Sequence, residues 1–274
     1  MVEDYLKIYS PLTKCYKRKF PFKLATTSYI YPDHILPNVA ILAPFFDEIE
    51  LVLFESGEED NLPDKEQINA LMNLSLRQGV DFNVHLPIDI YLGDESEEVR
   101  SKGVSIVKRV IERTLCLNPS VYTLHFDQRN KNGQEEVDVE IWQSRIIRSI
   151  KEMVENGIEP NRMAIETLAY PFEWIEDIVR NFGFSICLDI GHILIQEQDL
   201  QLYLENYLSN TSIIHLHGFQ NGVDHLGIDR LTAPSLELIL STLRDYHGIV
   251  SIEVFSIDDL RRSLIILEEK WERE

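Results

Sequence analysis

Short apolar runs alternate along the whole chain with stretches in which apolar residues return at helical spacing. Each run contains four to six residues such as Val, Ile, Leu, Phe or Tyr, which is typical of a strand buried on both faces. The runs predict eight strands: residues 23–28 and 48–54, then NVHLP, YTLHF, MAIET, ICLDIGH, IIHLHG and VSIEVF. The clearest helical patterns cover residues 99–116, 138–156, 173–181, 235–246 and 258–271.

The spacing of the runs is that of a repeated strand–helix unit. The polar residues that end the last six runs are separated by 40, 41, 23, 26 and 38 residues. Eight such units in 274 residues predict an α/β fold, a single (β/α)8 TIM barrel over residues 21–274 after an N-terminal arm at 1–20. A doubly wound open sheet is the competing fold, but TTSYIYP after the first strand lacks a Gly-rich dinucleotide turn.

Acidic or imidazole side chains stand at the C-terminal ends of these runs. They are His85, His125, Glu166, Asp189, His215 and Glu253, with His192 three residues beyond Asp189. TIM barrels place their chemistry at the C-terminal ends of the strands, so these side chains are expected to converge. Such a cluster indicates a metal-dependent enzyme, whereas a lone histidine at a strand end is more often a hydrogen-bonded structural residue.

Other histidines are less directly tied to this cluster. His217 lies two residues after His215 and points to the same side of the strand, where it can support a ligand or contact substrate. His192 can alternatively cap or brace the helix that follows it. His34 and His247 are expected to be structural.

The kinds of ligand atom limit which metal ions can bind. Imidazole mixed with carboxylate, without thiolate, suits zinc, manganese, iron or cobalt, and zinc or manganese is our expectation. Six candidate ligands exceed the three or four that one tetrahedral ion takes, so we expect two or more ions. Glu166 can bridge two of them, as in two-metal sites that catalyse phosphoryl displacement. A single metal would suffice for a sugar isomerase.

Composition narrows the class of protein. The chain is 44% hydrophobic, yet no apolar run reaches the roughly 18–20 residues of a membrane span. The first 20 residues carry charges throughout and lack an apolar signal region, so we expect a cytoplasmic protein. Three cysteines without C-x-x-C spacing indicate ordinary thiols, with Cys187 packed in its strand.

Charge and loop composition bear on partners. The 26 basic and 46 acidic residues give a net charge of −20, which repels a polyanion and argues against nucleic acid as a partner. Lys14, Lys17, Arg18 and Lys19 cluster in the arm, where we expect them to be solvated. Loops at residues 55–63 and 128–136 are expected to overhang the C-terminal face of the barrel.

Six strand ends resemble the motifs of the xylose-isomerase-like superfamily of barrels, which includes endonuclease IV. The matching text is HLP, LHF, IET, LDIGH, the first His of IIHLHG and the Glu of SIEVF, and it covers nearly the whole chain. For the isomerase and epimerase branch the resemblance implies one divalent metal, on Glu166, Asp189, His215 and Glu253. For the endonuclease IV branch it implies further metals, with His85 and His125 at one and His192 at another.

A longer stretch resembles the cobamide-remodelling phosphodiesterase family. It runs TTSYIYPDHILPNVAILAPFFDEIELVLFES and continues with VHLPIDIYLG. This resemblance implies hydrolysis of the phosphodiester in the cobamide nucleotide loop, which separates the lower-ligand nucleoside side from the cobinamide phosphate side.

One position departs from the endonuclease IV pattern. That enzyme has Asp-x-His after strand seven, whereas Asp224 and His225 are adjacent here. Adjacent residues in an extended segment point to opposite sides, so we expect only one of them to bind a given metal. We expect His225 rather than Asp224 to be the ligand.

The sequence thus predicts a metal-dependent hydrolase of a small cobamide substrate. Glu166 or Glu253 would accept the proton of the attacking water. His217, Thr26, Thr27 and Ser28 would contact the phosphate or the corrinoid side chains.

Two other functions stay open. One is a sugar or sugar-phosphate isomerase or epimerase that uses one metal and exchanges a proton between Glu166 and Glu253. The other is a corrinoid-binding protein without turnover. His85 and His125 separate the hydrolase from the isomerase, since a one-metal isomerase does not need them.

Overall fold

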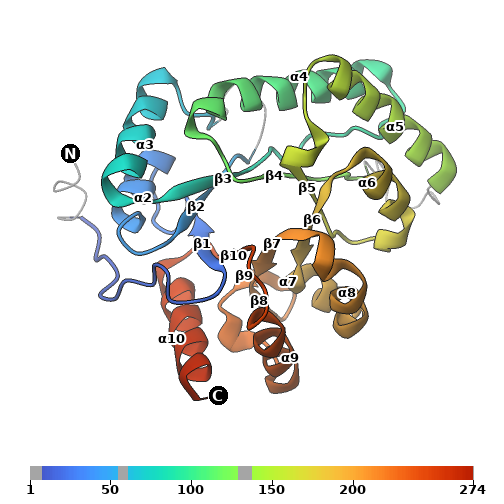
Figure 1. Cartoon of the computed structure of the whole chain (residues 1–274). Helices are drawn as coiled ribbons and strands as arrows, with labels where there is room; N and C mark the ends of the chain where they lie inside the picture. Colours follow the sequence, from blue (N-terminus) through green and yellow to red (C-terminus); the bar gives the residue numbers. More distant parts are fainter. Residues whose placement is uncertain (1–7, 55–60, 129–137, 274) are drawn as a thin grey trace.

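A computed structural model describes residues 8–54, 61–128 and 138–273 of the chain. Eight of its strands form one closed parallel barrel in the order β1-β10-β7-β6-β5-β4-β3-β2, and the predicted (β/α)8 barrel is confirmed (Figure 1). The barrel strands are β1 (Lys23–Thr27), β2 (Glu48–Val52), β3 (Asp81–His85), β4 (Tyr122–Leu124), β5 (Met163–Glu166), β6 (Ser185–Asp189), β7 (Thr211–Leu216) and β10 (Ile249–Ile252).

Helices surround the barrel on its outside (Figure 1). They are α2 (Ile35–Leu42), α3 (Lys65–Gln78), α4 (Glu97–Thr114), α5 (Val139–Glu155), α6 (Glu176–Phe182), α7 (Ile190–Ile195), α8 (Leu200–Tyr207), α9 (Ala233–Leu243) and α10 (Ile257–Arg273). All five helices expected from periodicity are present, with ends shifted by up to three residues. The ends follow local chemistry: Asp138, for example, caps α5 by accepting from the amide of Ile141.

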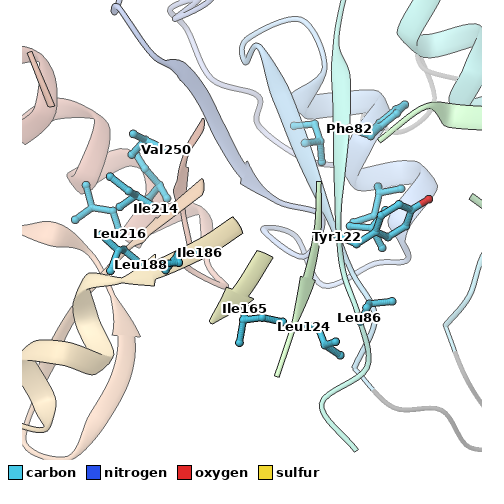
Figure 2. Close-up of a cluster of buried hydrophobic side chains, with 14 of the residues drawn as sticks. Phe82, Leu86, Tyr122, Leu124, Ile165, Ile186, Leu188, Ile214, Leu216 and Val250 are labelled. Carbon is cyan, nitrogen blue, oxygen red and sulfur yellow. The ribbon is translucent and has the colours of Figure 1, made fainter. Parts of the chain in front are cut away.

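Side chains alternate in direction along each barrel strand. Apolar residues such as Ile165, Leu188 and Ile214 belong to the large core shared with the helices (Figure 2). Their neighbours Glu166, Asp189 and His215 are buried polar residues. The strands therefore present an apolar face to the helices and a polar face to the interior of the barrel.

The interior has an apolar floor below this polar layer. A separate cluster of small and medium apolar side chains fills it: Ala25, Val121, Ala164, Cys187, Ile213 and Ile249. The floor closes the barrel beneath the polar side chains, so the polar layer is reached from the C-terminal ends of the strands.

A short antiparallel hairpin follows β7 and was not predicted. It pairs β8 (Gly218–Gln220) with β9 (Val223–Leu226), and its register shifts between Gly218 and Gln220. Asn221 and Gly222 form its turn with φ of 53° and 76°. Asn-Gly in the left-handed region is a favoured two-residue hairpin turn, so the local signal was present in the sequence.

The segment before β1 packs against the barrel where it is described. Leu12 and Tyr16 are buried, and Lys17 donates a hydrogen bond of 3.0 Å to the carbonyl of Gly79. Residues 1–7, 55–60 and 129–137, which include part of the expected arm and most of both expected overhanging loops, lie outside the described residues. No helix in the described ranges is long and apolar enough to cross a membrane.

Candidate metal centre

The seven residues singled out at strand ends converge at one end of the barrel. His85, Glu166 and Asp189 are the last residues of β3, β5 and β6, and His215 lies one residue from the end of β7. His125 and Glu253 directly follow β4 and β10. Parallel strands in a closed barrel bring these ends together, which is why the sequence pattern located the site.

Glu166 lies at the centre of the cluster and is 1% exposed. Its Oε2 is 3.1 Å from His85 Nε2 and 2.9 Å from His125 Nε2. Its Oε1 lies 3.5 Å from His192 Nδ1 and 3.7 Å from His215 Nδ1. The two oxygens of one carboxylate therefore face two different groups of histidines.

The first two candidate ligand sets share this carboxylate. One set comprises His85, His125 and Glu166, and the other comprises Glu166, Asp189, His215 and Glu253. Within each set the ligand atoms all lie within 4.8 Å of one another. In the second set His215 Nδ1 is 3.1 Å from Glu253 Oε2 and 3.8 Å from Asp189 Oδ2.

Glu50 in β2 stands behind His215 and was not singled out from the sequence. Its Oε1 is 3.0 Å from His215 Nε2, and its Oε2 accepts a hydrogen bond of 2.5 Å from the Ser251 hydroxyl. Neither Glu50 Oε1 nor His215 Nε2 has a hydrogen-bond partner among the described residues, so the contact is an ion pair. A carboxylate this close to the far nitrogen of an imidazole favours a proton there and leaves the other nitrogen for a metal. The signal in the sequence was the alternation of Glu48 and Glu50 in EIELV, which marks both as inward-facing.

A third set comprises His192, His217, Asp224 and His225, whose ligand atoms also lie within 4.8 Å of one another. Asp224 Oδ1 is 3.0 Å from His217 Nδ1, and Asp224 Oδ2 is 3.5 Å from His192 Nε2. The expectation that adjacent Asp224 and His225 point apart is wrong. His225 has φ of 53°, in the left-handed region, so the alternation of an extended strand is broken at this residue.

His217 connects the second and third sets. Its Nε2 is 3.0 Å from Asp189 Oδ1, while its Nδ1 faces Asp224. The imidazole lies against Gly191 in α7, where a Cβ would come within 1.9 Å of the ring. The glycine of LDIGH is therefore needed for His217 to occupy this position.

Several buried ligand atoms in these sets have no hydrogen-bond partner. They are both ring nitrogens of His215, Glu253 Oε2, His192 Nδ1 and His225 Nδ1. Buried polar atoms are normally paired, and unpaired ones point to an ion or a water. The mixed imidazole and carboxylate donors fit divalent zinc or manganese, so all three sets are suited to hold a metal.

The electrostatics of the cluster couple protons to metal binding. Burial alone would lower the pKa of His85 and His192, but the surrounding carboxylates raise these pKa values to about 9 and about 10. Burial would raise the pKa of Glu166, but His125 and His215 hold it well below its usual range. Without metal, His85 and His192 are therefore protonated at neutral pH, and a bound cation would displace these protons.

The site opens into a cavity of about 640 Å³. Its polar lining is formed by ligand-set residues together with the carboxylates of Asp89 and Asp127 and by Tyr91 and Gln196. No Lys or Arg from residues 8–54, 61–128 or 138–273 lines it. An anionic ligand in the described part of this cavity would therefore draw its countercharge from bound metal or from protonated histidines.

Asp127 is a second residue not singled out from the sequence. It lines the cavity two residues beyond His125, and burial raises the pKa of its carboxyl. A carboxyl with a raised pKa beside a reaction site is suited to give or take a proton.

Other sequence expectations have mixed outcomes. Thr26 and Thr27 donate to the carbonyls of Ile252 and Val254, and Ser28 accepts from the amide of Val52. All three side chains are fully buried, as is His217, and none of the four lines the cavity, so their expected contacts with the phosphate or the corrinoid are wrong. The hydrogen bonds of the first three connect β1 to the neighbouring chain segments instead.

The remaining candidates lie outside the three ligand sets. Cys187 lies near Glu166 and His215, but burial raises the pKa of its thiol well above the usual value, which disfavours the thiolate that metals bind. His34 precedes α2 as its N-cap residue but its side chain makes no cap hydrogen bond, so its structural role stays a prediction. His247 Nδ1 lies 3.1 Å from the carbonyl of Pro21.

A family model described as the xylose isomerase-like TIM barrel matches residues 45–273. The chain belongs to this family. Its members share the closed parallel barrel found here, and the resemblance read from the strand-end motifs is confirmed at this level. A comparison with curated proteins finds no significant match.

Solved structures with the same fold have diverse activities. A D-tagatose 3-epimerase-like protein is 24% identical, with a TM-score of 0.73, over 92% of this chain and 97% of the other. Endonuclease IV from Thermus thermophilus is 15% identical, with a TM-score of 0.67, over 92% of this chain and 100% of the other. The IOLI protein, described with a binding zinc atom, is 13% identical, with a TM-score of 0.68, over 92% of this chain and 96% of the other. These likenesses show the fold, and the choice of reaction depends on the site.

Proposed function

We propose that this protein is a metal-dependent phosphodiesterase that hydrolyses the phosphodiester in the nucleotide loop of a cobamide. The observation that carries this proposal is the position of Glu166, whose two oxygens face two separate groups of histidines. A carboxylate in this position is suited to bridge two cations. Two divalent cations about 3.5–4 Å apart lower the pKa of water and stabilise the attacking and leaving oxygens of an in-line displacement.

His85 and His125 favour this reaction over the isomerase alternative. A one-metal site needs only Glu166, Asp189, His215 and Glu253, which form a complete set by themselves. The additional imidazoles both contact Glu166 Oε2 and would be unnecessary in such an enzyme. In the phosphodiesterase they complete a second cation site on the same carboxylate.

The protein's own groups can also handle the protons of hydrolysis. Glu253 lines the cavity, and its Oε2 lies 3.7 Å from His225 Nδ1. Asp127 lines the same cavity two residues after His125. Burial would raise the pKa of Glu253, but His215 holds it well below its usual range, so Glu253 is better suited to bind a metal than to accept a proton. Asp127, whose pKa is raised by burial, is better suited to exchange protons with the attacking water and the leaving oxygen.

The charge of the cavity restricts the substrate. Glu166, Glu253, Asp224, Asp89 and Asp127 line it, and its described part contains no basic side chain other than histidine. A duplex that requires many contacts to lysine and arginine is disfavoured, as the net charge of −20 also indicates. A small substrate with one phosphodiester suits the site, and the stretches at residues 26–56 and 84–93 resemble enzymes that act on cobamides.

The proposal is tested by incubating purified protein with adenosylcobalamin and zinc or manganese and separating the corrinoids by chromatography. We expect a phosphorylated corrinoid without its lower-ligand nucleoside, and no cleavage of DNA with an abasic site. Unchanged corrinoid with each metal, together with interconversion of a ketose such as tagatose, would show that the epimerase alternative is correct.

A further inference from the structure

An aromatic surface adjoins the metal centre on one side of the cavity. Phe54 follows β2 and Phe255 follows β10, and both line the cavity with 38% and 37% of their surface exposed. Among the residues that the structure describes, they are the most exposed Phe, Tyr or Trp side chains, and Tyr91 in the same cavity is half-buried. Apolar surface left facing a cavity beside a polar centre is stabilised when a ligand covers it.

The two phenylalanines belong to a continuous row of rings that ends at a candidate metal ligand. The centroids of Tyr29 and Phe54 are 4.6 Å apart, and those of Phe54 and Phe255 are 6.0 Å apart. Phe255 then packs edge-on against His225 at 5.2 Å. We call Phe54 and Phe255 the aromatic shelf; a group lying on it would be one ring away from the third ligand set.

The backbone around the shelf is held in place before any ligand binds. The amide of Ile88 donates a hydrogen bond of 3.2 Å to the carbonyl of Phe54. The amide of Phe54 donates a hydrogen bond of 3.3 Å to the side-chain oxygen of Asn61. Asn61 in turn donates to the Tyr29 hydroxyl oxygen at 2.6 Å and to the carbonyl of Val52 at 2.9 Å. A surface fixed in this way loses little entropy on binding.

The angle between the two phenylalanine rings limits which planar groups can bind to them. The planes of Phe54 and Phe255 are inclined by 50°, so the rings form a notch and not one flat surface. A group the size of a nucleobase can stack on one ring and meet the edge of the other, both of which are favourable aromatic arrangements. The broad, flat face of a macrocycle could lie on only one of two rings inclined in this way. The absence of lysine and arginine from the described lining also disfavours a second phosphate here.

We propose that the aromatic shelf binds a heteroaromatic base joined through a sugar to the phosphodiester, so that the enzyme recognises the nucleoside side of its substrate. This inference rests on the proposed phosphodiesterase function and specifies which half of the substrate enters the cavity. The corrinoid half would then lie outside the shelf.

Binding of a benzimidazole ribonucleotide to the metal-loaded protein, measured by titration calorimetry, tests the shelf without requiring turnover. The double variant Phe54→Leu/Phe255→Leu keeps apolar bulk but removes both rings. We expect it to bind the ribonucleotide about tenfold more weakly or worse, within the range for loss of base stacking. Inorganic phosphate, the probe without a ring, should bind both proteins equally.

Phe20→Leu is the matched control, because Phe20 is also a phenylalanine that stacks on another ring, here Phe22, but it does not line the cavity. It should leave ribonucleotide affinity nearly unchanged. The proposal would be overturned if the double variant bound the ribonucleotide as tightly as the unchanged protein does. It would also be overturned if the double variant lost as much affinity for phosphate as for the ribonucleotide. A selective loss of affinity for cobinamide phosphate would overturn it as well. Failure of corrinoid cleavage alone would instead contradict the phosphodiesterase and would not alter this binding result.

Discussion

Glu166 is the residue on which the chemistry depends most directly. Replacing it by glutamine keeps the side-chain shape but removes the charge that would compensate two cations. We expect Glu166→Gln to lower kcat by more than about a hundredfold, beyond the range seen for outer-shell changes, and to lower the metal content. Circular dichroism should show an intact fold. Cys187→Ser is the control, because it changes a buried neighbour of the same cluster, and it should keep nearly full activity. A Glu166→Gln protein that binds metal and stays active would refute the bridging role.

Glu50 acts through His215 and is therefore a positioning residue. Glu50→Gln removes the negative charge that faces His215 Nε2 but keeps the volume of the side chain. We therefore expect metal affinity to fall about 10–100-fold. Competition with a chromogenic chelator measures this affinity. Glu48→Gln is the matched control, because Glu48 is equally buried in β2 but pairs with Lys23. Equal metal affinity in the two variants would exclude the role of Glu50.

Helix α7 shows how an element positions a side chain from another strand. Gly191→Ala places a methyl group against the His217 ring, which must then move. We expect this variant to lose metal from the third ligand set while keeping the other two. Isothermal titration with zinc should register one fewer binding event.

A double-mutant cycle separates this effect from a general effect on α7. If the methyl group acts through His217, Gly191→Ala should have no further consequence for zinc binding in a His217→Ala background. Additive losses in the double variant would show that Gly191 acts by another route.

The elements were more predictable from sequence than their detailed geometry. The barrel strands and the periodic helices follow from local patterns of apolar residues, and the closed barrel places their ends together. The position of Asp224 and His225 did not follow, because it depends on a left-handed residue and a shifted register in the β8–β9 hairpin. The contact of Glu50 with His215 likewise depends on strands that are distant in the chain.

At the scale of the whole molecule, the excess of carboxylates governs how protons and metal compete. The pKa of His85 in the fold is raised to about 9, above the roughly 6.5 of an unfolded chain. Protonated His85 therefore stabilises the metal-free protein below pH about 6.5, and this contribution is lost as the pH rises through about 9.

Metal affinity should show the opposite trend and increase between pH of about 6 and 9, because the ligands must lose their protons. Calorimetric zinc titrations in buffers of different ionisation enthalpy should register net proton release at neutral pH. The same heat in every buffer would contradict the proton-coupled network.

The number of metal ions per chain tests the central claim most directly. The protein should be loaded with zinc or manganese, freed of excess ion by gel filtration and assayed by elemental analysis, beside a His85→Ala/His125→Ala variant. The shared carboxylate of Glu166 predicts at least two ions per chain in the unchanged protein and one fewer in the variant. A single ion in both proteins would contradict the multi-metal centre and support the one-metal epimerase.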